Sequence, residues 1–206
     1  MTNILYDLTN QDMRQAGLHL ADAFYEDPIW KAILEGFNHE EKGLFFEIST
    51  RYCRKYGSVL SPSSKLESVM GYVPGHLSNM TNLRIILSGA VWPAIKLGKK
   101  MQEIGPMINE SLEPMEIHRA DIMKGRTYTY LMMIGTQTAL QRQGHAKKLL
   151  LHLIEESDKQ GIPVYLETET ETNVEIYQRF DFNVIRQITL PVIDLPMWLM
   201  VREPAQ

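Results

Sequence analysis

The sequence predicts a mixed α/β fold in which strands and helices alternate irregularly. Segments rich in β-branched and aromatic residues are interspersed with segments whose apolar residues recur every three or four positions. Strands follow one another directly at residues 58–73 and again at residues 183–202, which excludes a repeating βα barrel and an all-parallel doubly wound sheet. Because nothing repeats at a fixed period and no low-complexity run marks a linker, we expect a single domain over residues 1–206.

In the N-terminal part of the chain, residues 3–8 alternate apolar and polar side chains and should form a short strand. Thr9 is typical of a helix N-cap, and the helix after it should end before Pro28, because proline restricts the residue that precedes it. A second helix is expected over residues 40–57, where a glycine ends the apolar periodicity. The strands of residues 58–73 should then form a hairpin.

Residues 75–113 are expected to form a helical insert. Apolar spacing in this segment is helical, but prolines and glycines interrupt it, so we expect two or three short helices joined by turns. Residues 127–134 form the most strand-like segment of the chain. The remaining expected elements are a helix at residues 144–160, a strand at 163–167, a short helix at 173–180 and strands at 183–190 and 197–202.

Composition and charge limit the classes of partner. The chain is 44% hydrophobic and 22% charged, as soluble globular domains are, and its net charge of -4 argues against a nucleic-acid partner. The most apolar stretch, residues 83–97, contains charged residues and is too short to span a membrane. Cys53 is the single cysteine, no signal peptide is evident, and the histidines lack metal-ligand spacing. We therefore expect a cytoplasmic protein without a metal, membrane or nucleic-acid partner.

The chemically informative segment is the passage from the strand at residues 127–134 to the helix that follows. A strand, a polar loop and a helix N-terminus together make an anion site, because the first helical N–H groups lack intrahelical partners. Gly144 and Ala146 leave room for phosphate oxygens at the backbone, and Arg142 and Lys147 add positive charge. The alternative is that Gly144 only permits a tight turn. Neither a P-loop nor the full dinucleotide-binding fingerprint is present.

This segment resembles the signature of the GNAT superfamily of N-acetyltransferases, Gln/Arg-x-x-Gly-x-Gly/Ala, which Gln141, Gly144 and Ala146 match in register. The family's preceding strand commonly ends in a pattern like Leu-x-Val-x-Pro. This chain has Thr136 and Thr138 in place of the valine and the proline.

The resemblance continues at residues 165–168 and 173–182, which look like the family's next strand and its Asn-x-x-x-Tyr-x-x-x-Gly-Phe helix, with Asp181 where glycine is usual. These motifs and residues 23–28 are most similar to the puromycin N-acetyltransferase-like branch. The resemblance implies a mostly antiparallel central sheet, splayed between its fourth and fifth strands, with helices on both faces. It also implies acetyl-CoA as donor and a primary amine of a small molecule as acceptor, by direct attack on the thioester.

Two other functions stay open at this point. One is acetylation of a protein N-terminus or lysine side chain, which would need an open groove where the insert is expected to cover the site. The other is a non-catalytic CoA-binding module of the same fold. A homodimer is one of the assemblies that the resemblance leaves open.

The resemblance also assigns residues to the cofactor. The pyrophosphate should lie on the N–H groups of residues 142–146, and the backbone of Ile134 and Thr136 should pair with pantetheine like a short added strand. Asn173 should cap the short helix or contact the cofactor. The full expected set is Ile134, Gly135, Thr136, Gln141, Arg142, Gln143, Gly144, His145, Ala146, Lys147, Asn173 and Tyr177.

Amine acetylation needs a proton acceptor for the amine and a proton donor for the departing CoA thiolate. Tyr177 is the expected acid, and packing on its own helix is the alternative. Glu167 is the expected base, with a positional role as the alternative and Glu169 and Glu171 as competitors in the same acidic stretch. The acceptor amine should meet aromatic surface and negative charge contributed by Tyr25, Asp27 and Trp30.

Overall fold

The described residues of the computed structural model, 5–205, contain a single seven-stranded sheet in the order β1-β2-β3-β4-β5-β7-β6. All neighbouring strands are antiparallel except β4 and β5, which are parallel. The strands are β1 (Tyr6–Asp7), β2 (Ser58–Ser61), β3 (Ser68–Pro74), β4 (Thr129–Thr136), β5 (Val164–Thr168), β6 (Asn183–Leu190) and β7 (Leu195–Arg202).

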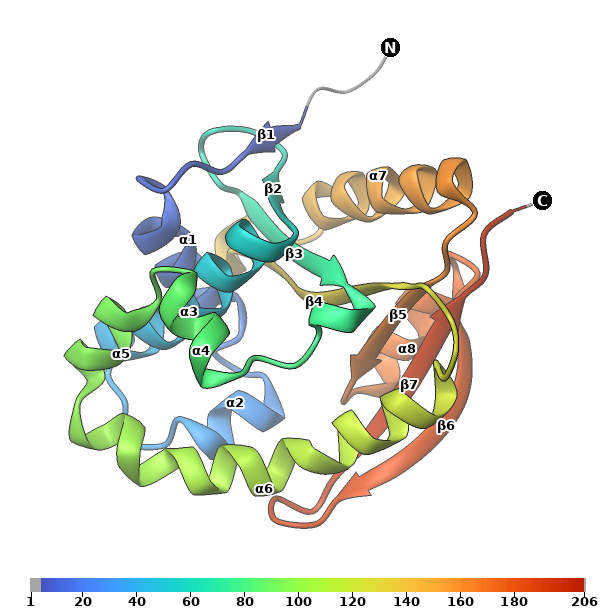
Figure 1. Cartoon of the computed structure of the whole chain (residues 1–206). Helices are drawn as coiled ribbons and strands as arrows, with labels where there is room; N and C mark the ends of the chain where they lie inside the picture. The colour runs from blue at the N-terminus through green and yellow to red at the C-terminus, as the bar shows by residue number, and fades with distance from the viewer. Residues whose placement is uncertain (1–4, 206) are drawn as a thin grey trace.

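Helices cover both faces of this sheet, with α1 and α3 on one side and α7 on the other (Figure 1). The predicted fold class, a mixed and mostly antiparallel sheet between helices, is thereby confirmed. The helices are α1 (Met13–Ala23), α2 (Pro28–Ile33), α3 (His39–Tyr56), α4 (Asn82–Leu87), α5 (Val91–Leu97), α6 (Lys99–Ile122), α7 (His145–Gln160) and α8 (Glu171–Gln178). No helix in the described part of the chain is long and apolar enough to cross a membrane.

Two separate apolar cores follow from the alternation of side chains along the strands. Val69 points into the core beneath α1 and α3, whereas its neighbour Met70 points into the core beneath α7. In the same way Tyr130 and Leu131 of β4 belong to opposite cores. The sheet is therefore buried on both faces in its centre, where the site is built.

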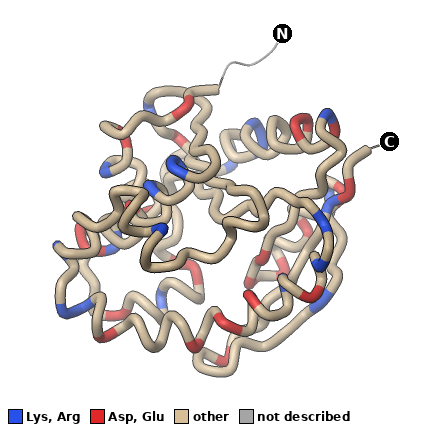
Figure 2. The backbone as a smooth tube through the Cα atoms, in the orientation of Figure 1, with Lys and Arg blue, Asp and Glu red and all other residues tan. Residues whose placement is uncertain are grey.

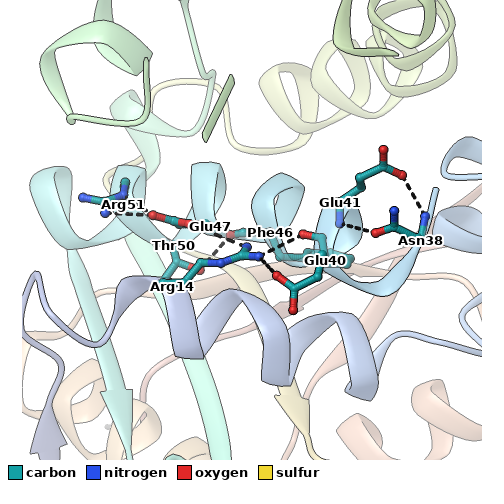
Figure 3. Close-up of polar contacts among 8 residues, drawn as sticks. All are labelled: Arg14, Asn38, Glu40, Glu41, Phe46, Glu47, Thr50 and Arg51. Carbon is teal, nitrogen blue, oxygen red and sulfur yellow. Dashed lines mark hydrogen bonds and ion pairs between the residues drawn. The ribbon is translucent and has the colours of Figure 1, made fainter. Parts of the chain in front are cut away.

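Polar contacts fix α3 against α1 (Figure 3). Asn38 and Glu41 form a capping box, in which each side chain accepts a hydrogen bond from the backbone N–H of the other residue. Arg14 of α1 forms ion pairs with Glu40 and with the buried Glu47 of α3. These contacts hold α1, whose C-terminal end approaches the site, in a fixed position on α3.

The central sheet opens between β4 and β5. The two strands pair only at Thr129 with Val164 and at Tyr130 with Tyr165. Next in β4, Met132 has no partner in β3, because the register slips there by one residue. Such a bulge bends its strand. As a result β4 stays paired with β3 as far as Thr136 while its other edge diverges from β5.

The insert between β3 and β4 differs from the sequence prediction. Gly89 separates the short helix α4 from α5 and Gly98 separates α5 from α6, both with positive φ values as turns require, but α6 runs unbroken through Pro106 and Pro114. Each proline removes one helical hydrogen bond. Tertiary contacts keep α6 intact, since it contacts both α2 and β6 and crosses the lower edge of the molecule in Figure 1.

Two details near the N-terminus also differ from the prediction. The first helix begins at Met13, and Asp12 rather than Thr9 is its N-cap residue; the Thr9 N–H and hydroxyl both donate to the Asp12 carboxylate. Pro28 does not only end a helix but begins α2, because proline at the first helical position gives up no hydrogen bond. The predicted strand at residues 3–8 is β1, and part of that range lies outside the described residues.

Candidate active site

A cavity of about 180 Å³ lies where β4 diverges from β5. Residues from β4, the start of α7 and the region of α8 line it, and five of them belong to the set expected from the sequence to bind a cofactor. The lining residues are Ile134, Ala146, Lys147, Leu150, Asn173, Ile176, Tyr177 and Phe180. The structure thus brings together residues that the sequence places in three separate segments.

The free edge of β4 forms one side of this region. Gln137 N–H, just after β4, donates to the Glu67 carbonyl at 3.1 Å, and the Ser68 hydroxyl donates to the Gly135 carbonyl at 2.9 Å, so the backbone groups of Gly135 and Gln137 face β3. Because backbone groups of successive strand residues point to opposite sides, the N–H and C=O groups of Ile134 and Thr136 face away from β3. They are the backbone groups expected to pair with pantetheine.

Gly135 lets α1 approach β4 at this point. A Cβ at Gly135 would lie 2.9 Å from the Cβ of Ala23, closer than side chains tolerate. The loop after β4 is tied to the same helix, since Thr138 N–H donates to the Asp22 carboxylate at 2.7 Å. The C-terminal end of α1 therefore lies beside the free edge of β4.

The start of α7 has the features of an anion site. Gly144 is its N-cap residue with φ of 83°, no side chain caps the helix, and the first helical bond runs from Lys148 N–H to the Gly144 carbonyl at 3.1 Å. The N–H groups of residues 145–147 therefore have no intrahelical partner. Residues 141–144 are exposed, and a Cβ at Gly144 would meet no atom within 4 Å.

These observations fit the binding of CoA. Uncapped N–H groups at a helix start attract a pyrophosphate, and Arg142 and Lys147 add charge beside them. The open space at Gly144 admits a ligand close to the backbone, while the free edge of β4 offers donors and acceptors to an extended amide chain. His145 is the first residue of α7, so its N–H belongs to the same group of donors.

Tyr177 lies on α8 with its ring against Phe182, at 5.6 Å between ring centroids, and it lines the cavity. Burial, and secondarily the nearby Glu169 carboxylate, raises the pKa of its hydroxyl well above the usual range. The phenol therefore holds its proton throughout the neutral range. The ring packs as the alternative from the sequence expects, and the residue also lines the cavity, so its role as the acid stays a prediction.

Two other residues of the Asn-x-x-x-Tyr-x-x-x-Gly-Phe pattern lie on α8 or just after it. Asn173 does not cap the helix: Thr170 is the N-cap residue, and its hydroxyl accepts from Asn173 N–H at 3.2 Å. The capping prediction was therefore wrong, and the Asn173 side chain lines the cavity instead. Asp181 follows α8 with φ of 65°, a left-handed conformation that aspartate tolerates better than most residues, which explains why glycine is usual there.

Glu167 lies on β5 in a buried network. Its Oε1 accepts from Arg119 Nη1 at 2.8 Å, and its Oε2 accepts from the Tyr130 hydroxyl at 2.7 Å. Arg119 comes from α6, lies over the Tyr130 ring and also donates to Asn79. Arg119 could not be predicted from the sequence, because it is one of several charged residues on α6. Both oxygens of Glu167 are thus already engaged by hydrogen-bond donors.

A second pair of carboxyl groups, those of Asp27 and Glu169, meets where α2 begins and β5 ends. Asp27 caps α2 by accepting from Trp30 N–H at 3.1 Å, and it also contacts the Glu169 carboxyl group. Burial, together with the charge of Asp27, raises the pKa of Glu169 to about 8, and burial also raises the pKa of Asp27. Such a pair holds a shared proton near neutral pH.

The other two residues expected at the acceptor site are placed differently. Trp30 packs between Phe45 and Phe46, with ring centroids 5.3 and 5.5 Å away, so its surroundings are those of a core residue. Tyr25 is 59% exposed, and Lys42 lies over its ring. Of the three, Asp27 is the one that contacts another carboxyl group, that of Glu169.

Comparison with known proteins extends this description. The model of the acetyltransferase (GNAT) family matches residues 111–182, which include the opened strand, the helix start and α8. An uncharacterized N-acetyltransferase of Schizosaccharomyces pombe is 28% identical over 204 residues, covering 94% of this chain and 81% of that protein.

Solved structures share the whole fold. One, described as histone acetyltransferase HPA2 and related acetyltransferase, comes from Corynebacterium glutamicum; its TM-score is 0.64 at 16% identity, covering 100% of this chain and 98% of that one. Another is arylalkylamine N-acetyltransferase 2 from Aedes aegypti, with a TM-score of 0.65 at 14% identity, covering 98% and 99%. At these identities the likeness concerns the fold alone.

The free edge of β4 and the uncapped start of α7 are the two features expected from the sequence for a site that binds an acyl-CoA donor. The matched family segment at residues 111–182 and the Schizosaccharomyces pombe relative support an N-acetyltransferase enzyme of the GNAT type. Enzymes of this family generally use acetyl-CoA as acetyl donor.

Proposed function

We propose that this protein transfers an acetyl group from acetyl-CoA to the primary amine of a small molecule. The observation that carries the proposal is the cavity beside the free edge of β4, which Ile134, Ala146 and Tyr177 line. It joins a free strand edge and an uncapped helix start, which can hold the donor, to a phenol that can supply a proton. The proposal keeps the puromycin N-acetyltransferase-like branch as its finer assignment, on the motifs at residues 165–168 and 173–182.

Acetyl-CoA, when bound, supplies the acetyl thioester. The N–H groups of residues 142–147 would hold its pyrophosphate, and the outward backbone groups of Ile134 and Thr136 would hold its pantetheine amides. Gln141 and Gln143 are exposed in the loop between them and would shape it, while Asn173 lines the cavity on the far side. Together these residues orient the donor along β4.

Tyr177 is the proposed general acid. Its hydroxyl keeps its proton because burial raises its pKa, and Tyr177 lines the cavity in which we expect the thiolate sulfur to depart. Such a phenol gives up its proton only when negative charge develops on the departing sulfur, which is a much stronger base than a neutral carbonyl. The residue therefore acts on the leaving group and contributes little to holding the resting donor.

The Asp27–Glu169 pair is the proposed proton acceptor, in place of Glu167. Glu167 already accepts from Arg119 and Tyr130, so an approaching ammonium would have to displace a buried partner. Asp27 and Glu169 instead share a proton between themselves, and a pKa of about 8 at Glu169 suits acceptance of a proton from an amine near neutral pH. Glu167 keeps the positional role that the sequence left open for it.

A small acceptor is favoured over a protein because α6 crosses the opened side of the sheet. Lys100, near its start, forms an ion pair with Glu41 of α3 at 2.6 Å. Near its end, Asp121 forms an ion pair with Arg186 of β6 at 3.0 Å. A helix fixed at both ends on this side of the sheet restricts access for a peptide, which would need an open groove.

The test is a turnover assay with acetyl-CoA and an acceptor panel, read as release of the CoA thiol. The panel contains arylalkylamines, aliphatic diamines, puromycin, peptides with free N-termini and peptides with internal lysines. We expect turnover with at least one small amine and none with the peptides. Turnover confined to peptides would contradict the substrate class. Binding of acetyl-CoA without release in any mixture would contradict catalysis.

A further inference from the structure

The helices α4 and α5 expose a row of large apolar side chains. On α4 they are Leu83, Ile86 and Leu87, and on α5 they are Trp92 and Ile95; each is between 56 and 68% exposed. Their spacing of three and four residues places those of each helix on one outward face. Pro93 and Leu97 of α5 and Ala90 just before it are buried, and both α4 and α5 contact α3, so the two helices are part of the folded domain.

The charge around this face has one sign. Residues 68–102 contain no aspartate or glutamate, although the chain carries 25 acidic residues and a net charge of -4. Arg84, Lys96 and Lys99 lie on the same two helices or just beyond them, and none of the three takes part in an ion pair within the described chain. Figure 2 shows basic but no acidic residues along α4 and α5.

A row of exposed apolar side chains flanked by basic residues is unusual on the surface of a soluble protein. Soluble monomers seldom expose a contiguous group of this many large apolar side chains without a binding role. A self-complementary contact between two copies would bring the same basic residues together, and like charges disfavour it. A lipid membrane with anionic headgroups can bind the basic residues and, at the same time, take up the apolar side chains. Short helices with tryptophan, leucine and lysine at their outer side bind such surfaces.

We propose that the α4–α5 face docks this protein peripherally on anionic lipid membranes. The apolar row enters the boundary between headgroups and acyl chains, and Lys96 and Lys99 lie at the level of the anionic headgroups. The expectation from the sequence that no membrane partner exists rested on the lack of a spanning segment. A peripheral contact needs no such segment. The proposal does not depend on the identity of the acceptor amine, because the face lies outside the residues assigned to catalysis.

The experiment is flotation of the full chain with vesicles of phosphatidylcholine, with and without phosphatidylserine. We expect binding to the vesicles that contain phosphatidylserine, and a decrease of that binding as salt concentration rises. Tryptophan emission should shift to shorter wavelength on binding, since Trp92 is 68% exposed while Trp30 and Trp198 are partly buried. The shift should be absent in Trp92→Phe.

Substitutions on α4 and α5 test whether these residues contact the membrane. Replacing Leu87 and Ile95 together by serine should weaken vesicle binding by about tenfold or more, because each side chain loses apolar burial. Lys96→Glu should weaken binding to phosphatidylserine vesicles by about fivefold or more. Leu151→Ser on α7, another exposed leucine, and Lys65→Glu in the β2–β3 loop are the matched controls and should bind as the parent does. Circular dichroism and acetyl-CoA turnover confirm that each variant is folded.

Three results would overturn the proposal. The first is failure of the parent chain to bind vesicles of either composition. The second is equal binding to both compositions, which would remove the role of the basic rim. The third is a monomer–dimer equilibrium, seen by sedimentation velocity, that the Leu87 and Ile95 substitutions abolish while vesicles have no effect; the face would then be an interface between copies.

Discussion

Arg119 Nη1 lies 2.8 Å from Glu167 Oε1, and both side chains are only 4% exposed. This ion pair joins α6 of the insert to β5, the strand that borders the opening of the sheet. Arg119 also donates to Asn79 at 2.9 Å, and the Tyr130 hydroxyl donates to the second oxygen of Glu167. A buried charge pair with these additional hydrogen bonds positions the insert over the site.

Removal of one partner should destabilise the protein strongly. Arg119→Met leaves the Glu167 carboxylate buried without its cation, and we expect the free energy of unfolding to fall by about 3–5 kcal/mol in urea denaturation. The double variant with Glu167→Leu should recover part of this loss, because no unpaired charge remains. Arg126→Met, which removes an exposed ion pair with Glu203, is the control and should cost at most about 1 kcal/mol. Equal losses for Arg119→Met and Arg126→Met would contradict the buried pair.

The pH dependence of turnover separates the two candidate bases. Since the pKa of Glu169 is raised to about 8, turnover should rise as the pH passes through about 8, and Glu169→Gln should remove this limb and lower the rate. An arylamine acceptor, neutral over this range, keeps the titration of the substrate out of the profile. Glu171→Gln, an exposed neighbour, is the control. Glu167→Gln should give a profile parallel to that of the parent; a lost limb in that variant would restore Glu167 as the base.

The same group links stability to pH. Folding raises the pKa of Glu169 from 4.5 to about 8, so between these values the folded state binds more protons than the unfolded state. Stability attributable to this group is therefore fully present below about pH 4.5 and is lost as the pH rises through about 8. We expect the difference in melting temperature between Glu169→Gln and the parent to grow in favour of the variant over this range. A difference that is independent of pH would show that Glu169 is not perturbed.

Gly144 and Gly161 flank α7 with the same left-handed conformation and thus make a matched pair. A Cβ at either position meets no atom within 4 Å, and their φ values are 83° and 65°. Valine at either glycine should therefore cost similar backbone strain. Only Gly144→Val should also weaken acetyl-CoA binding, by about tenfold or more in calorimetry, because its side chain occupies the space beside the uncapped N–H groups. Equal affinities of the two variants for acetyl-CoA would show that the pyrophosphate does not bind at the start of α7.

Local signals in the sequence predicted much of the fold and one side of the site. Side-chain alternation and helical spacing located the strands around the opening and the helix α7, and the loop at residues 141–146 is a contiguous motif whose conformation depends on its own glycine. The course of α6 through Pro106 and Pro114 was not predicted, because contacts with distant helices and strands offset the cost of each proline.

Polar pairs between residues far apart in the chain could not be predicted from the sequence for the same reason. Arg119 and Glu167 are 48 residues apart, and neither is distinguished from other charged residues around it. Asp27 and Glu169 were each named, the first for the acceptor and the second as a competing base. Their contact depends on how α2 packs beside the end of β5. Pairing of charges across elements follows from tertiary packing, which a single sequence does not encode as a local pattern.

The sharpest test of the chemistry is Tyr177→Phe, which keeps the ring against Phe182 and removes only the hydroxyl. Loss of a positioned general acid typically lowers the rate by about 10²- to 10⁴-fold, equivalent to about 3–5 kcal/mol of barrier. Acetyl-CoA affinity should change by less than about tenfold, because the phenol acts on the departing thiolate. Stopped-time turnover and calorimetry with the same preparation give both values. Since the pKa of Tyr177 is raised above its usual range, its ionisation should add no limb to the profile near neutrality.

Tyr52→Phe provides the control for removal of a buried tyrosine hydroxyl. Tyr52 is fully buried and donates to the Leu77 carbonyl at 2.7 Å, but it lies outside the cavity lining. Its loss should lower stability by about 1 kcal/mol and leave kcat within about twofold. A Tyr177→Phe variant with the kcat of the parent would show that this tyrosine only packs, and one that no longer binds acetyl-CoA would show that it holds the donor. A large fall in kcat with retained affinity is the result that the geometry of the cavity requires.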